Sequence, residues 1–64
     1  MQLITYFNYD NGGKEKVEDC IVELVSSDDT QVTYRKDIGI RKQEVSIPRK
    51  FIKKQLDDLL VLEY

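Results

Sequence analysis

The chain contains no histidine, no tryptophan and a single cysteine among its 64 residues. Without histidine it cannot assemble a Ser-His or Cys-His nucleophile from its own side chains, and the commonest general base is missing. One cysteine cannot form an internal disulfide, and without histidine it cannot complete a structural zinc site. We therefore predict a non-enzymatic protein with no catalytic residue, no bound metal and no cofactor.

Long apolar runs are also missing, and the N-terminus lacks the basic and apolar regions of a signal peptide. A membrane-spanning helix needs about 20 predominantly apolar residues, so no membrane association is expected. Cys20 lies in the short apolar run Cys20-Ile21-Val22, which favours a buried thiol that packs as a small hydrophobic side chain. An unpaired cysteine is most easily kept reduced inside the cell, so we expect a cytoplasmic protein.

The chain is short, so its hydrophobic core must be small. A chain of about 60 residues buries only about 60% of the surface that its unfolded form exposes. We expect residues 1–64 to form one small domain, with a net stability of about 3–5 kcal/mol from its core. Since neither a disulfide nor a metal can add stability, we expect a homodimer to supply additional buried area.

Two segments in the first half of the chain have the composition of strands. Residues 2–9 are rich in β-branched and aromatic side chains, with apolar groups on both faces. The following Asn11-Gly12 is a strong hairpin signal, because both residues tolerate positive φ. Residues 14–27 fit a strand by their β-branched content and a helix by their apolar spacing. We favour the strand and keep the helix as the alternative.

The second half of the sequence predicts two more strands and then a helix. Residues 30–35 alternate regularly, and residues 43–47 form a last strand after a loop at residues 37–40. Pro48 suits the first position of a helix, and apolar residues follow it at helical spacing. That apolar stripe consists of Phe51, Ile52, Leu56, Leu59 and Leu60. We interpret residues 59–64 as a last helical turn or as a short extra strand.

Together these elements predict an α+β fold. A small antiparallel sheet of about four strands would pack against one C-terminal helix, in the order ββββα. If residues 14–27 are helical, the order becomes βαββα. In both orders the C-terminal helix covers the apolar face of the sheet.

Positive charge is distributed unevenly along the chain. Of the ten lysine and arginine residues, eight lie between residues 35 and 54, where only Asp37 and Glu44 are acidic. The eight cations are Arg35, Lys36, Arg41, Lys42, Arg49, Lys50, Lys53 and Lys54. The last four fall at the start of the predicted helix, where the helix dipole favours acidic residues. This placement does not stabilise a helix and instead indicates a surface that binds an anion.

We therefore predict a small regulatory module that binds an anionic partner, with nucleic acid favoured, through these eight side chains. Rings such as Tyr34 or Tyr6 would offer surfaces on which bases stack. The alternative is a protein-interaction or inhibitory module that uses the acidic face of residues 15–23 and an apolar C-terminal interface. This interface would consist of Leu60, Leu62 and Tyr64. A third interpretation is structural, since the cations can neutralise the acidic residues of the 15–23 face within the folded protein.

Overall fold

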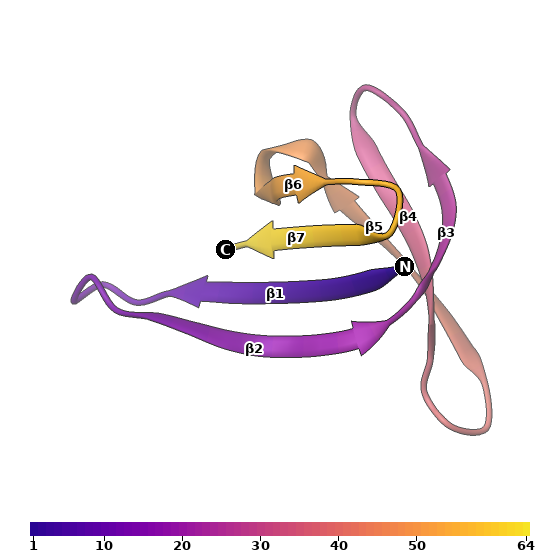
Figure 1. The fold of residues 1–64 in the computed structure, drawn as a ribbon, viewed down its shortest axis with the longest axis horizontal. Helices are drawn as coiled ribbons and strands as arrows, with labels where there is room; N and C mark the ends of the chain where they lie inside the picture. Colours follow the sequence, from indigo (N-terminus) through magenta and orange to yellow (C-terminus); the bar gives the residue numbers. More distant parts are fainter.

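Short runs of alternating apolar and polar residues occur along most of the chain, and the protein is built almost entirely from strands. The computed structural model describes residues 1–64 and contains seven β-strands, one short 3₁₀ turn and no α-helix (Figure 1). The elements are β1 (Gln2–Asn8), β2 (Lys14–Ile21), β3 (Glu23–Ser27), β4 (Gln31–Asp37), β5 (Lys42–Pro48), η1 (Arg49–Phe51), β6 (Ile52–Gln55) and β7 (Leu59–Glu63). The strands form two sheets, which we call sheet A and sheet B. No helix in the structure is long and apolar enough to span a membrane.

Sheet A has four strands in the order β2-β1-β7-β6. β1 and β2 form an antiparallel hairpin, and its turn contains Gly12 at φ +87°, a conformation that favours glycine. β1 pairs on its other side with β7, in parallel, so the first and last strands lie side by side in the middle of the sheet (Figure 1). This central position explains why β1 carries apolar side chains on both faces.

Sheet B has three antiparallel strands in the order β3-β4-β5. The chain passes from sheet A into sheet B at the buried Val22, whose N–H donates to the carbonyl of Met1 at 2.8 Å. The strands of sheet B run steeply across those of sheet A (Figure 1). The two sheets therefore cover each other only where they cross, and the β1–β2 hairpin extends well beyond that crossing.

The hydrophobic core lies where the two sheets cross. Its seven buried apolar residues are Leu3, Leu60 and Leu62 from sheet A, Val32, Tyr34 and Ile47 from sheet B, and Val22 between the sheets. Cys20 packs against this cluster as a partly buried free thiol, and burial raises its pKa. The thiol is therefore protonated at neutral pH and contributes to packing.

The predicted C-terminal helix is absent, and the α+β fold class is wrong. Pro48 ends β5 and is followed only by the 3₁₀ turn η1. Leu60 and Leu62 alternate with partly exposed residues, so the period of β7 is two rather than 3.6. Leu56, which the predicted helix would bury, is 50% exposed in the turn between β6 and β7. An all-β fold replaces both predicted orders, ββββα and βαββα.

The physical reason for this error is a long-range pairing that overrides the local spacing of apolar residues. β7 is hydrogen-bonded to β1 on one side and to β6 on the other, so both of its edges are paired. A helix over the same residues would leave one edge of β1 without a partner, and buried backbone groups need partners. The short extra strand considered for residues 59–64 is confirmed. Because β1 and β7 are parallel, sheet A is mixed rather than antiparallel as predicted.

The other strand predictions are confirmed. Residues 14–27 are extended, as favoured, and the passage through Val22 divides them into β2 and β3. β1, β4 and β5 lie within a few residues of the predicted strands. The helical alternative for residues 14–27 fails because their apolar side chains alternate between the faces of paired strands.

Candidate functional site

Two of the eight predicted anion-binding side chains form ion pairs within the protein. The guanidinium of Arg35 contacts Glu23 at 2.9 Å and Glu44 at 3.7 Å, on neighbouring strands of sheet B. Lys36 pairs with Glu18 of β2 and so connects the two sheets. The hydrogen bond to Glu18 raises the pKa of Lys36. Both cations are therefore already engaged with carboxylates.

A third cation, Arg49, stabilises the junction between η1 and its neighbours. Its guanidinium donates to the carbonyl of Asp28 at 2.8 Å, to Oγ of Ser27 at 2.7 Å and to Oε1 of Gln55 at 2.8 Å. These bonds tie η1 to the β3–β4 turn and to β6. Arg49 thus has the partners of a structural residue.

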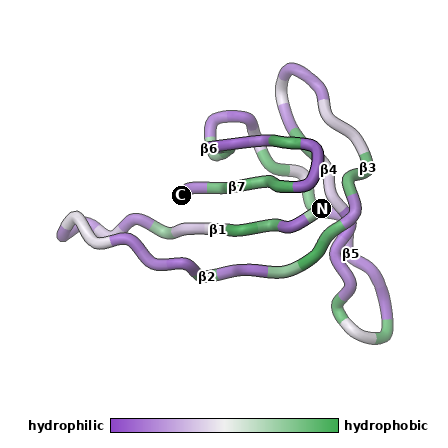
Figure 2. The backbone as a smooth tube through the Cα atoms, in the orientation of Figure 1, coloured by the Kyte–Doolittle hydropathy of each residue, from purple (hydrophilic) through white to green (hydrophobic).

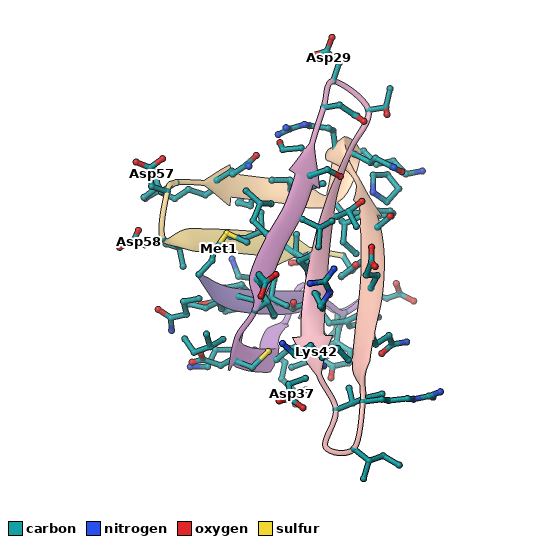
Figure 3. The ribbon with its side chains drawn as sticks, turned by 90° about the vertical axis from the view of Figure 1, so that its right-hand side faces the viewer. Met1, Asp29, Asp37, Lys42, Asp57 and Asp58 are labelled. Atoms are coloured by element: carbon teal, nitrogen blue, oxygen red, sulfur yellow. The ribbon has the colours of Figure 1, made fainter.

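The other predicted cations are distributed over separate parts of the surface. Arg41 and Lys42 lie at the β4–β5 hairpin, at the end of sheet B opposite the β3–β4 turn (Figure 3). Lys50 and Lys53 lie around η1 and the start of β6, where both line a hollow of about 300 Å³. Lys54 pairs in register with Val61 of β7. The structure therefore brings Lys50 and Lys53 together around one hollow and Arg35 and Lys42 around another, and Arg35 is already paired with carboxylates.

The predicted C-terminal interface is divided by the alternation of β7. Leu60 and Leu62 are 0% and 1% exposed and belong to the core. Tyr64 follows β7 and is 41% exposed. Of the three residues, only Tyr64 is accessible to a partner in this structure.

Tyr64 belongs to a row of aromatic side chains on the face of sheet A that is turned toward sheet B, which we call the inner face. Leu3, Thr5 and Phe7 alternate along β1, so Phe7 lies on the inner face. The rings of Phe7 and Tyr9 meet edge to face, with centroids 5.1 Å apart. Tyr9 thus continues the line of the inner face toward the β1–β2 turn.

Parallel pairing of β1 with the end of the chain adds two more rings. The N–H of Tyr64 donates to the carbonyl of Tyr6 at 3.0 Å, and its carbonyl accepts from the N–H of Asn8 at 2.9 Å. These bonds continue the parallel ladder and place Tyr64 beside Phe7. The ring of Phe51 lies 4.7 Å from that of Tyr64. We call these four residues the aromatic row: Tyr9, Phe7, Tyr64 and Phe51.

The aromatic row is accessible because it lies past the crossing of the two sheets. Phe7 is 44% exposed, Tyr9 46% and Tyr64 41%, whereas Phe51 is partly buried against the core. The end of β1 and the β1–β2 turn that follows it extend away from sheet B (Figure 1). A contiguous set of exposed rings is unusual on a small soluble protein and indicates a binding surface.

Cations lie at one end of the aromatic row. The ammonium group of Lys50 is 5.0 Å from the centroid of the Phe51 ring, a cation–π contact. Lys53 lines the same hollow as Phe51, together with Asn8 and Glu63. Neither Lys50 nor Lys53 forms an ion pair. The charge of Lys53 contributes to the lowered pKa of Glu63, whose first cause is the hydrogen bond from Asn8. This end of the row therefore combines an aromatic ring with two cations that form no salt bridge.

Carboxylates near the aromatic row are engaged by protein groups. Glu15 accepts a hydrogen bond from the hydroxyl of Tyr9, and this bond raises the pKa of Tyr9. Glu18 accepts from Thr5 at 3.1 Å and pairs with Lys36. Burial and the charge of Glu18 raise the pKa of Tyr64. Both tyrosines are therefore neutral at physiological pH and present uncharged rings.

The two rings proposed from the sequence for base stacking lie elsewhere. Tyr34 is 4% exposed in the core, and burial raises its pKa to about 12. Tyr6 lies on the opposite face of sheet A, with the ammonium group of Lys14 4.7 Å from its ring centroid. The sequence did contain one signal for the actual row, the alternation Phe7-x-Tyr9. Its continuation through Tyr64 and Phe51 depends on pairing between opposite ends of the chain.

A second hollow, of about 510 Å³, lies where β2 passes into β3. Its apolar lining includes Met1, Ile21 and Leu24, and Ile21 is 73% exposed. Charged side chains border it, among them Lys42 and Asp57 (Figure 3). This hollow lies beside the acidic face that the sequence associates with a protein partner.

No group of three or more Cys, Asp or Glu side chains is arranged to hold a metal ion. The exposed carboxylate of Asp28 instead accepts hydrogen bonds from its own turn. Comparison of the chain with protein families, curated proteins and solved structures gave no match. We therefore infer the function from the geometry of the surface.

Proposed function

We propose that this protein is a small non-enzymatic module that binds single-stranded nucleic acid through the aromatic row and the adjacent Lys50 and Lys53. The observation that carries the proposal is the aromatic row, which has three exposed rings and, at its Phe51 end, two lysines that form no salt bridge. The predicted site of eight cations is thereby reduced to two, and rings from both ends of the chain are added.

The chemistry of single-stranded nucleic acid suits this surface. Bases stack on aromatic side chains with about 1–3 kcal/mol per base, and lysines pair with the phosphates between them. In a duplex the faces of the bases are already stacked on one another, so the rings have nothing to contact. We therefore expect a preference for single strands.

The net charge of −2 does not prevent this mode of binding. The acidic side chains nearest the row already have cationic or hydroxyl partners, since Glu18 pairs with Lys36 and Glu63 lies 3.7 Å from Lys14. Interactions between exposed charges more than about 10 Å apart are largely screened at 0.1 M salt. Binding therefore depends on the charge near the row rather than on the total.

Fluorescence anisotropy with labelled oligonucleotides tests the proposal. At low salt we expect single strands to bind with a dissociation constant well below about 1 mM, and at least about tenfold more tightly than a duplex of the same sequence. Equal affinity for both forms, or no binding at millimolar protein, would rule out recognition by stacking.

Two matched pairs of variants locate the site. Lys50→Glu with Lys53→Glu is expected to weaken binding at least about tenfold and to reduce the salt slope by about 1.4, the value for two lost phosphate contacts. Arg41→Glu with Lys42→Glu makes the same charge change at the β4–β5 hairpin and should leave the affinity within about twofold.

Phe7→Ala should weaken binding about 5- to 100-fold, whereas Ile40→Ala, at a side chain that is fully exposed, should not. Equal losses within each pair would contradict this assignment.

A second candidate function, binding of another protein, is favoured by the hollow between β2 and β3. Ile21, Leu24 and Val25 expose 73%, 44% and 40% of their surface there and along β3. A pull-down from nuclease-treated cell extract tests it, with Ile21→Asp as the variant expected to lose the partner. Retention of the same protein by Ile21→Asp and by the aromatic-row variant Phe7→Ala would exclude both surfaces.

A further inference from the structure

Sheet A has a second face, turned away from sheet B, which we call the outer face. Alternation along β1 and β7 places the buried Leu3, Leu60 and Leu62 toward sheet B, and therefore Ile4 and Val61 on the outer face. All strands of the protein belong to the two sheets, so no element of the chain covers this face. Apolar segments of β1 and β7 lie side by side in its centre (Figure 2).

The register of the strands places a cation on one side of this apolar centre and an anion on the other. Lys54 of β6 is paired with Val61 of β7, Val61 with Ile4 of β1, and Ile4 with Asp19 of β2. One line across the four strands therefore reads cation, apolar, apolar, anion. Cross-strand partners share a face of the sheet, so all four side chains lie on the outer face.

We propose that the outer face binds a second copy of this chain, face to face, about a two-fold axis that runs parallel to the strands between β1 and β7. Relative to the first copy, the second copy then has its strands in the reverse order across the interface, and they run in the same direction. It sets Lys54 of each copy opposite Asp19 of the other, and Ile4 opposite Val61. The result is an isologous interface with an apolar centre and an ion pair on each side.

The alternative two-fold axis in the plane of the interface runs across the strands. It would set Lys54 opposite Lys54 and Asp19 opposite Asp19, which is repulsive at both sides. Asp19 already forms a salt bridge with Lys16 at 3.2 Å and accepts a hydrogen bond from Gln2 at 3.0 Å. Each carboxylate oxygen accepts only one of these hydrogen bonds, so lone pairs remain for Lys54 of the other copy. The charge pattern therefore selects the axis parallel to the strands.

Association through the edges of sheet A is disfavoured by its bulges. The register shifts at Val17 in the edge strand β2 and at Lys53 in the edge strand β6. A bulge on an edge strand interrupts the regular row of backbone N–H and C=O groups with which another strand would form hydrogen bonds, and exposed lysines on the edge disfavour such pairing. The outer face is thus an apolar surface of sheet A that a second copy can cover.

The size of the face sets the concentration range for a test. Four strands about 4.8 Å apart and about six residues long give a projected area of about 400 Å². This is smaller than the roughly 800 Å² that each partner buries in a standard stable interface. We therefore expect a weak dimer, and sedimentation velocity from about 10 µM to 1 mM covers the expected transition.

Charge reversal and mixing test the symmetry directly. Lys54→Asp and Asp19→Lys, each alone, should raise the dimer dissociation constant at least tenfold, because each places like charges opposite one another. Mixed in equal amounts, the two variants should associate to within about threefold of the wild-type affinity, because the mixed dimer has opposite charges on both sides. Lys42→Asp makes a matched charge change in β5 of sheet B and should have no effect.

Several outcomes would overturn the proposal. The first is a wild type that stays monomeric at 1 mM. The second is a mixture of the two variants that stays monomeric although both retain the wild-type circular dichroism spectrum. The third is an increase in the dimer dissociation constant with Lys42→Asp that equals the increase with Lys54→Asp. Both changed side chains are exposed, so folding should be preserved. If Asp19→Lys does not fold, Asp19→Asn keeps the oxygen that accepts from Gln2 and should still weaken the dimer severalfold. The test needs no ligand, so its result is independent of nucleic-acid binding.

Discussion

At the scale of single residues, a few polar side chains fix the turns and the contact between the sheets. The carboxylate of Asp28 accepts hydrogen bonds from the N–H and hydroxyl of Thr30, both at 2.8 Å, and from the N–H of Gln31 at 2.9 Å. Asp is favoured at such positions because its short side chain bonds the backbone two and three residues ahead. The bond with Thr30 lowers the pKa of Asp28, with the Gln31 bond and Arg49 acting in the same direction.

This lowered pKa predicts an acid-dependent contribution to stability. A carboxyl group whose folded pKa lies below its unfolded value of about 3.9 stabilises the fold above that value and loses this effect as the pH falls through the folded pKa. We expect Asp28→Asn to be less stable than the wild type at pH 6, with a difference that shrinks steadily below about pH 4. Urea unfolding between pH 2 and pH 6 measures this.

Asp29→Asn is the matched control, since the Asp29 side chain makes no hydrogen bond in the structure and the variant should follow the wild type. A difference between Asp28→Asn and the wild type that is constant over the whole pH range would show that ionisation of Asp28 has no role in stability.

At the scale of elements, β7 decides the fold. It forms the only parallel pairing of the fold, with β1, and it carries two of the seven core residues. The spacing of apolar residues after Pro48 fits a helix as well as a strand, because a short apolar run matches both periods. The available partner, β1, selects the strand.

Paired alanine substitutions distinguish these two structures for the C-terminal segment. Leu60→Ala removes a fully buried side chain from a central strand and should destabilise by about 2–5 kcal/mol, enough to unfold much of so small a domain. Leu56→Ala, at a 50% exposed side chain, should change stability by less than about 1 kcal/mol. Thermal or urea unfolding of both variants measures the difference, and a larger effect at Leu56 would favour the helix.

At the scale of the whole molecule, the steep crossing of two small sheets leaves parts of both faces of sheet A exposed. The inner face carries the aromatic row beyond the crossing, and the outer face carries the line from Lys54 to Asp19. Because these surfaces lie on opposite faces of one sheet, a dimer formed through the outer face would leave two aromatic rows accessible. Nucleic-acid binding and dimerisation are therefore compatible in this architecture.

The candidate site was only partly predictable from the sequence. The excess of positive charge in residues 35–54 is a property of composition, but Arg35 and Lys36 pair with carboxylates from other strands. Which cations stay free depends on which acids the fold brings to them. Lys50 lies over the ring of Phe51, and Lys53 shares a hollow with Asn8 and Glu63 without forming a salt bridge.

The sequence alone determined the strands β1, β4 and β5 and favoured extended structure for residues 14–27, because alternation and turn residues act over a few positions. Pairing with β1 and β4 excluded the helical alternative and divided that segment at Val22. The tertiary structure alone decided the state of residues 49–64, the crossing of the sheets and the position of the aromatic row. The strand state of residues 59–63 and the position of the aromatic row depend on β7 pairing beside β1. A short apolar run fits the periods of both helix and strand, and it does not specify a partner at the opposite end of the chain.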